Sequence, residues 1–129
     1  MARHRRILIV DSSKYFGSSM WRTLIPETEF EIVGPTITTN ETLIMAFSLV
    51  PDIILVDLAR PASKRLQTVA TLRSVYPNIP IITFMPIVSK EYTQASLNAG
   101  ASACVPKAEM ADVLLQTMQR VGAEISRPQ

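Results

Sequence analysis

Ile53-Ile54-Leu55-Val56-Asp57 is a run of four branched aliphatic residues that ends in a carboxylate. A strand that is covered on both faces of a sheet has a continuous apolar run of this kind. The same pattern occurs at Ile7-Leu8-Ile9-Val10-Asp11, and a third apolar run extends from Ile79 to Phe84. We therefore predict three central strands of a parallel sheet, two of which lead into an aspartate.

Two weaker strand patterns complete the sheet. Residues 29–33 alternate between polar and apolar side chains, which is typical of an edge strand with one solvated face. Ala103-Cys104-Val105 is a short fifth strand, and Pro106 fits only at its end. Segments with helical periodicity follow the strands, and we expect helices over residues 13–25, 38–50, 63–76, 89–99 and 110–121.

Two of these helices have informative details. Thr38 and Glu41 have the spacing of a capping box at the start of the second helix. The fourth helix stops at Gly100 and offers only a thin apolar face, so we expect it to be the least firmly anchored. The residues of that face are Tyr92, Ala95, Leu97 and Ala99.

Alternation of strands and helices predicts an α/β fold, a three-layer α/β/α sandwich with strand order 2-1-3-4-5. In such sheets, ligands bind beyond the carboxyl ends of the strands, where the strand order reverses. That position lies between the first and third strands, at Asp11 and Asp57. We expect one domain over residues 1–129, with a structured core at about 6–121 and a tail at 122–129.

Composition narrows the class of protein. The chain has 129 residues, 47% of them hydrophobic and 19% charged, which is typical of one globular domain. The net charge of +2 and a solvated basic cluster at Arg3, Arg5 and Arg6 do not indicate nucleic-acid binding. No apolar run is long enough to span a membrane, and the single cysteine, Cys104, cannot form an internal disulfide. We expect a cytoplasmic protein with no direct nucleic-acid or membrane contact.

Three residues that could carry chemistry converge on the predicted carboxyl edge. Asp11 and Asp57 should lie about one strand spacing apart, and Lys107 follows the fifth strand. Two carboxylates with oxygen ligands suit Mg²⁺, and the lysine is a point positive charge that could pair with a carboxylate or a phosphoryl oxygen. Each residue alone could be an ordinary loop, capping or solvated residue, but all three together favour a functional site.

These features resemble a response-regulator receiver domain, the CheY-like phospho-acceptor module of two-component signalling. The resemblance extends from Arg6 to about Val121, and four segments carry it: residues 7–11, residues 51–61, Pro80-Ile81-Ile82, and Ala99-Gly100-Ala101 with Lys107 seven residues after the glycine. It implies a flavodoxin-like (βα)5 fold in which Asp57 accepts a phosphoryl group from a sensor histidine kinase or a phosphotransfer protein. It also implies that Asp11, Asp57 and Ala59 hold Mg²⁺ and that Lys107 assists the transfer.

Three positions depart from the family pattern. Ser12 stands where the family has a second acidic residue, so we expect weak Mg²⁺ binding. Met85 stands at the switch Ser/Thr position, and a thioether cannot donate a hydrogen bond to a phosphoryl oxygen. Cys104 replaces the switch aromatic residue, and we interpret it as buried packing rather than a redox sensor.

Three functions stay open at this point. The first is a divergent receiver that is phosphorylated on Asp57, a self-phosphorylating acceptor domain at most and not an enzyme. The second is a pseudo-receiver, an interaction module that no longer signals by phosphorylation. The third is a small enzyme on the same fold.

For the first two readings, the resemblance implies an output surface on the fourth helix, fifth strand and fifth helix. A homodimer could form through this surface. Its exposed candidates are Lys90, Glu91, Gln94 and Gln119.

Overall fold

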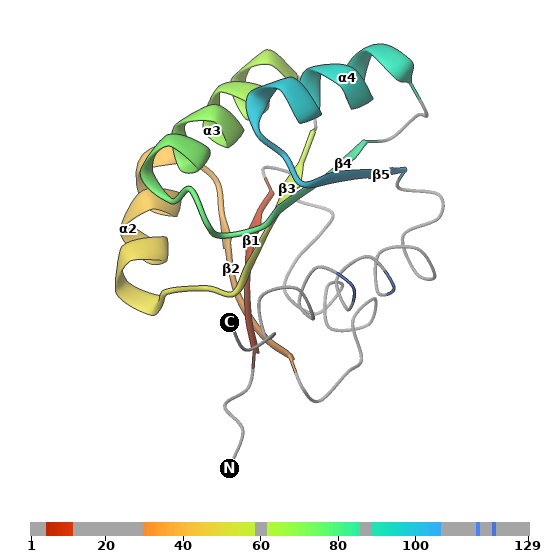
Figure 1. Ribbon diagram of the computed structural model, residues 1–129. Helices are drawn as coiled ribbons and strands as arrows, with labels where there is room; N and C mark the ends of the chain where they lie inside the picture. Colours follow the sequence, from red (N-terminus) through yellow and green to blue (C-terminus); the bar gives the residue numbers. More distant parts are fainter. Residues whose placement is uncertain are drawn as a thin grey trace.

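A computed structural model describes residues 5–11, 30–58, 62–85 and 89–106 together with Gln116 and Arg120, and the following account concerns these residues. They include five parallel strands in the order β2-β1-β3-β4-β5, as the sequence predicts (Figure 1). The strands are β1 (Arg5–Val10), β2 (Phe30–Thr36), β3 (Ile53–Asp57), β4 (Ile81–Met85) and β5 (Ala103–Pro106).

Helices α2 (Thr39–Leu49), α3 (Ala62–Val75) and α4 (Lys90–Ala99) lie together on one face of this sheet (Figure 1). Their bounds confirm three of the five predicted helices to within one or two residues. The first and last predicted helices, residues 13–25 and 110–121, lie outside the continuously described segments.

The predicted capping box of α2 and the predicted end of α4 at Gly100 are confirmed, and the structure adds an N-cap at Ser89. Glu41 N donates to Thr38 Oγ1 at 3.1 Å, and Thr38 N donates to Glu41 Oε1 at 3.3 Å, which completes the capping box of α2. Ser89 caps α4 by accepting from Tyr92 N at 3.2 Å. Gly100 ends α4 with φ 116°, a left-handed conformation that only glycine adopts without strain.

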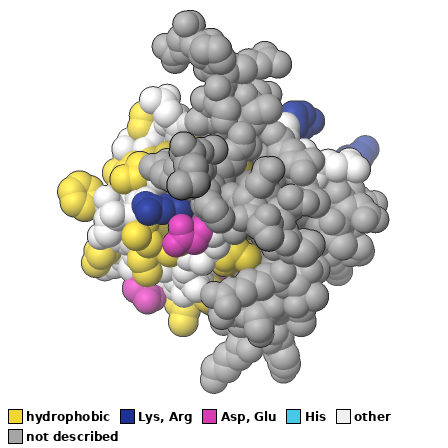
Figure 2. All heavy atoms as spheres, turned by 90° about the horizontal axis from the view of Figure 1, so that it is seen from below, with side chains coloured by type: hydrophobic (Ala, Val, Ile, Leu, Met, Phe, Trp, Pro, Cys, Tyr) yellow, Lys and Arg dark blue, Asp and Glu magenta, His cyan; other side chains and the backbone are white. Residues whose placement is uncertain are grey.

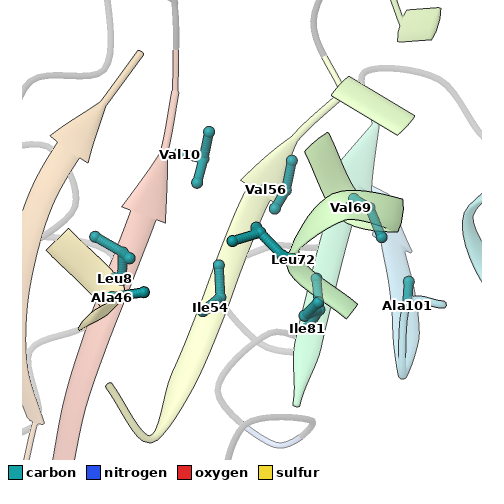
Figure 3. Packing of buried hydrophobic residues seen from close by; sticks show 9 residues of the cluster. All are labelled: Leu8, Val10, Ala46, Ile54, Val56, Val69, Leu72, Ile81 and Ala101. Atoms are coloured by element: carbon teal, nitrogen blue, oxygen red, sulfur yellow. The ribbon is translucent and has the colours of Figure 1, made fainter. Parts of the chain in front are cut away.

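The core lies between the sheet and these helices. All five residues of β3 and of β4 are buried, as continuous apolar runs predict for central strands. On the helical side, alternate strand residues pack against Ala46 of α2 and against Val69 and Leu72 of α3 (Figure 3). The strand residues in this cluster are Leu8, Val10, Ile54, Val56 and Ile81.

The edge strand differs from its prediction. β2 continues to Thr36, three residues beyond the predicted end at Val33. The alternating pattern ends at Gly34-Pro35, but pairing with β1 resumes beyond them, because Thr36 is the partner of Val10 after a break in the register. Tertiary pairing therefore extends a strand that the local sequence would end.

α4 also differs from its prediction. Tyr92 and Leu97, which we expected in the packing face, are 43% and 44% exposed, and the buried residue of α4 is Ser96. The helix packs against α3 and β5. The large side chains therefore point away from the contact, and a small one lies in it. The Ser96 hydroxyl is buried with no hydrogen-bond partner within the described part of the chain.

We expect Ser96→Ala to raise the free energy of unfolding by up to about 1 kcal/mol, because it removes a buried hydroxyl that has no described partner. Urea titration followed by circular dichroism measures the change. Ser48→Ala, at an exposed position of α2, is the matched control for helix propensity. A larger loss of stability for Ser96→Ala than for Ser48→Ala would contradict this interpretation.

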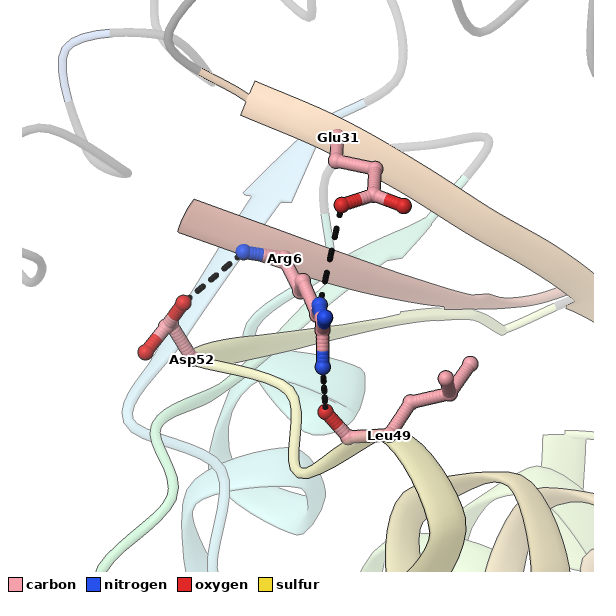
Figure 4. Close-up of polar contacts among 4 residues, drawn as sticks. All are labelled: Arg6, Glu31, Leu49 and Asp52. Carbon is pink, nitrogen blue, oxygen red and sulfur yellow. Dashed lines mark hydrogen bonds and ion pairs between the residues drawn. The ribbon is translucent and has the colours of Figure 1, made fainter. Parts of the chain in front are cut away.

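Arg6 connects several segments at the end of the sheet where the strands begin (Figure 4). Its Nη1 donates to Leu49 O at the end of α2 at 2.7 Å, and its Nε lies 3.6 Å from Glu31 Oε2 on β2. Its backbone N donates to Asp52 Oδ2 at 2.8 Å. Arg6 is therefore a part-buried link between three elements, which corrects its interpretation as part of a solvated basic cluster.

Candidate site at the carboxyl edge of the sheet

The pairing of β1 with β3 brings two aspartates to neighbouring positions. Ile9 is the partner of Leu55 and Val10 is the partner of Val56, so one further step places Asp11 level with Asp57. Adjacent strands lie about 4.8 Å apart, and both side chains follow the same alternation of the two strands. The pairing of the two strands therefore brings together the two aspartates that we predicted to form a site at this edge.

Both carboxylates are out of solvent. Asp11 is 2% exposed and Asp57 is 0% exposed. Burying a carboxylate costs free energy that hydrogen bonds or an opposite charge must offset, so buried acids concentrate where a protein binds cations or performs chemistry. The adjacent backbone is fixed, since Asp11 N donates to Thr36 O at 2.9 Å and Leu58 N donates to Phe84 O at 2.8 Å.

A chain of threonine hydroxyls supports the strand that carries Asp11. Thr36 Oγ1 and Thr42 Oγ1 are 2.8 Å apart, and each hydroxyl can also donate to a backbone carbonyl oxygen, Thr36 to Ile9 O at 3.3 Å and Thr42 to Thr38 O at 2.8 Å. Thr36 O in turn accepts from Asp11 N. The sequence analysis missed this network because it explained the threonine-rich run at 36–42 by the predicted helix cap alone.

A buried arginine joins the two helices near this edge. Arg65 lies in the first turn of α3, and its Nη1 donates to Ile37 O at 2.6 Å. Ile37 is the residue directly after β2. Thr39 Oγ1 of α2 and Thr68 Oγ1 of α3 are 2.7 Å apart. These contacts hold the start of α2 against the first half of α3. No local sequence signal indicated that Arg65 would be buried.

The switch positions have distinct environments. Met85 is the buried last residue of β4, with Pro106 as its partner on β5. Thr83, two residues earlier on the same strand, is buried, and its Oγ1 donates to Ala103 O at 3.4 Å. Cys104 is half-buried, which corrects our expectation of a buried packing residue. A half-buried β5 side chain next to Thr83 can contact solvent from one side.

The remaining predicted site residues, Ser12, Ala59 and Lys107, lie outside the described residues. Their places relative to the two carboxylates therefore stay predictions. Among the residues that the structure describes, no group of three or more His, Cys, Asp or Glu side chains could hold a metal ion. Two buried carboxylates at neighbouring strand ends still supply the hard oxygen donors that suit Mg²⁺.

The chain is similar to several known proteins, although no protein-family model matches it. It is 36% identical over 107 residues to protein-glutamate methylesterase/protein-glutamine glutaminase 1 of Methanosarcina mazei, covering 81% of this chain and 29% of that protein. It is 26% identical over 116 residues to the transcriptional regulatory protein DegU of Brevibacillus brevis, covering 90% of this chain and 49% of DegU. The crystal structure of a CheY-like receiver domain from Methanospirillum hungatei aligns with a TM-score of 0.75 and 27% identity, covering 93% of this chain and 94% of that one.

The fold and the relatives together define a class. The homologues and the structural neighbours are CheY-like response-regulator receiver domains, and their flavodoxin-like fold matches the sheet order found here. This chain has the fold of a response-regulator receiver domain and is similar in sequence to such domains, and its fold and homologues support a role in two-component signalling.

The chain matches only part of the length of its relatives, so the properties of the whole relatives are not assigned to it. The chain spans about a third of the length of the methylesterase relatives, and the match is to their receiver part. Receiver domains are signalling domains, which interact with histidine kinases or phosphotransfer proteins and typically bind Mg²⁺ at an acidic pocket.

Among the described helices, none is long and apolar enough to cross a membrane.

Proposed function

We propose that Asp57 accepts a phosphoryl group from a sensor histidine kinase or a phosphotransfer protein and that the chain relays the signal through protein contacts. The observation that carries the proposal is the pair of buried aspartates, Asp11 and Asp57, at neighbouring ends of β1 and β3. An isolated buried acid can be structural, but two in one register row favour a site that holds a cation between them or beside them.

The transfer is a displacement at phosphorus. A carboxylate oxygen of Asp57 forms a new P–O bond, and the P–N bond of the donor phosphohistidine breaks with its electron pair left on the imidazole nitrogen. The product is an acyl phosphate on Asp57. Since little covalent work falls to the protein, its contribution is to position the carboxylate and to balance charge.

The residues of this edge fit a divalent cation. Asp11, Asp57 and the backbone of Ala59 would hold Mg²⁺, which when bound neutralises charge on the phosphoryl oxygens. Lys107 would hold a further phosphoryl oxygen as a point charge. Ser12 contributes a hydroxyl where a second carboxylate would add attraction, so binding of Mg²⁺ is weak.

The output surface in this proposal includes α4 and β5. Lys90, Glu91 and Gln94 are exposed, as predicted, and Gln119 lies outside the described residues. Met85 offers no hydroxyl proton to a phosphoryl group, so the signal reaches this surface without a Ser/Thr relay. The half-buried Cys104 is a free thiol, in keeping with the reducing cytoplasm that we propose as the location.

One observation favours a second candidate function. Met85 is buried at the end of β4, directly beside the edge that carries Asp57, and its thioether cannot form the hydrogen bond that the family's switch residue makes. The chain would then be a pseudo-receiver that binds partners independently of phosphate. The methylesterase and glutaminase activities belong to proteins about three times as long, and we propose neither of them for this chain.

Intact mass spectrometry after incubation with acetyl phosphate and Mg²⁺ separates the two functions. We expect one added phosphoryl group, lost on omission of Mg²⁺ and absent from Asp57→Asn. Asp52→Asn is the matched control, because Asp52 lies directly before the same strand, at the end opposite Asp57, and its Oδ2 accepts from Arg6 N at 2.8 Å. An unmodified wild-type chain would contradict phospho-acceptance and support the pseudo-receiver.

A further inference from the structure

Helices α2 and α4 begin in the same way, but α2 has an additional contact. Each has a threonine as its fourth residue, Thr42 or Thr93, whose Oγ1 lies 2.8 Å from the carbonyl oxygen of the N-cap residue. Thr42 Oγ1 also lies 2.8 Å from Thr36 Oγ1 at the end of β2. Thr42 is 0% exposed. The shared helix start explains the first contact of Thr42 but not the second.

Thr36 contacts both peptide groups that flank Val10, the residue before Asp11. Its carbonyl oxygen accepts from Asp11 N at 2.9 Å, and its Oγ1 lies 3.3 Å from Ile9 O. The register between β1 and β2 shifts just before this point, and Thr36 is the described β2 residue that pairs with Val10 after the shift. The position of Thr36 therefore bears directly on the backbone of Asp11.

The two hydroxyls stay linked whichever of them donates. If Thr36 donates, Thr42 can donate to Thr38 O, and if Thr42 donates, Thr36 can donate to Ile9 O. Thr36 is 1% exposed, so the pair is shielded from solvent. Removal of one hydroxyl would leave the other without its partner in a buried place.

Charged groups at the opposite end of the sheet have a different environment. Figure 2 shows the end where the strands begin, and Lys or Arg and Asp or Glu side chains reach the surface there. The side chains of Arg6 and Glu31 are 31% and 56% exposed, and solvent screens their 3.6 Å ion pair. Asp11 and Asp57 are buried, so solvent compensates less for a displacement of either carboxylate. The support of Asp11 therefore matters more than that of the surface acids.

We propose that Thr42 and Thr36 are positioning residues for Asp11. Their hydroxyl pair connects α2 to the end of β1 and so fixes the Asp11 carboxylate beside that of Asp57. This inference rests on the proposed function, because it takes the two aspartates as ligands of a divalent cation. Loss of a contact that holds a metal ligand in place typically weakens metal binding about 10- to 100-fold.

Titration of the full chain with MgCl₂, followed by proton–nitrogen correlation NMR spectra, tests the proposal. We expect the Kd for Mg²⁺ to rise about 10-fold in Thr42→Val, which keeps the shape of the side chain and removes its hydroxyl. Thr42→Ser restores the hydroxyl and should return the Kd to within about 2-fold of wild type. Thr93→Val removes the corresponding hydroxyl of α4 and is the matched control, with an expected change below about 2-fold.

The double variant Thr36→Val/Thr42→Val separates positioning from a merely structural role. Two valines leave no hydroxyl without its partner, so the free energy of unfolding should lie closer to wild type than in either single variant. Mg²⁺ binding should stay as weak as in Thr42→Val, because the hydrogen-bonded link to β1 is absent. Recovery of wild-type Mg²⁺ affinity in the double variant would overturn the proposal.

Hydrogen exchange of the metal-free chain gives a readout that does not depend on Mg²⁺. Because Asp11 N donates to Thr36 O, the Asp11 amide should exchange faster in Thr42→Val than in wild type or in Thr93→Val. Equal exchange rates in the three proteins would contradict the link between Thr42 and Asp11.

Failure of this inference and failure of the proposed function give different results. An unchanged Kd for Mg²⁺ in Thr42→Val, or an equal rise in Thr93→Val, would overturn the role of the threonines. So would a wild-type chain that binds no Mg²⁺. A chain that binds Mg²⁺ but accepts no phosphoryl group from acetyl phosphate would contradict the proposed function alone, and the Mg²⁺ affinities of the variants would still support or overturn the positioning role.

Discussion

Gly34→Ala is expected to lower the free energy of unfolding by about 3 kcal/mol or more. Gly34 has φ 99°, a conformation that side chains rarely allow, and a Cβ atom there would lie 2.9 Å from Ile9 O and 3.0 Å from Thr36 N. Both neighbours are backbone atoms of the β1–β2 pair, so neither can move aside without disturbing the pairing. Urea titration of the two proteins measures the loss.

The control for this substitution lies on the same strand. Glu31→Gln removes only the 3.6 Å ion pair with Arg6, and exposed ion pairs contribute little, so we expect a change below about 1 kcal/mol. Because Thr36 O accepts from Asp11 N, Gly34→Ala should also reduce phosphorylation of Asp57 under conditions where the variant is still folded. Wild-type stability of Gly34→Ala would show that β1 and β2 separate easily at this point.

The sheet and the position of its acidic pair were predictable because their signals are local. Continuous apolar runs such as Ile53–Val56 mark central strands, and a parallel sheet puts the residue after each strand at one edge, which places Asp11 beside Asp57. The caps at Thr38 and Gly100 were predictable for the same reason, since each depends on a few neighbouring residues.

The parts that sequence analysis missed depend on contacts between distant residues. The extension of β2 to Thr36 needs the partner strand, and the burial of Arg65 needs Ile37 O, which lies 28 residues away in the chain. Composition gives no hint of either contact. The exposure of Phe47 was also unpredictable. Apolar residues occur on most sides of α2, so periodicity alone does not indicate which side of the helix is buried.

Arg73 forms a second long-range connection, between α3 and the segments that lead into β4 and β5. Its guanidinium donates to four carbonyl oxygens and one hydroxyl, which are Gly100 O at 2.8 Å, Tyr76 O at 3.3 Å, Pro77 O at 2.9 Å, Ile79 O at 2.8 Å and Ser102 Oγ at 3.3 Å. Burial lowers the pKa of Arg73 from its ordinary value, yet a guanidinium stays charged at neutral pH. Hydrogen bonds from a charged donor are stronger than neutral ones, so this cluster should contribute substantially to stability.

We expect Arg73→Ala to lower the free energy of unfolding by about 3 kcal/mol, because several carbonyl groups lose a charged donor at once. Arg73→Lys should recover less than half of the loss, since an ammonium lacks the planar fork that reaches separate carbonyls. Lys64→Ala, at an exposed position of the same helix, is the control and should stay within about 0.5 kcal/mol of wild type. A full recovery by lysine would mean that charge alone, and not the geometry of the fork, holds the segments together.

Gly100 permits a sharper test of the same contact. A Cβ atom on Gly100 would lie 2.7 Å from Arg73 Cγ and 2.9 Å from Arg73 Cβ, so Gly100→Ala must displace the arginine stem as well as strain a backbone with φ 116°. In the Arg73→Ala background the Cγ contact no longer exists, and only the backbone strain and the Cβ contact remain. The sum of the losses of unfolding free energy in the two single variants should therefore exceed the loss in the double variant by about 1 kcal/mol or more. Strict additivity would show that Arg73 and Gly100 stabilise the start of β5 independently.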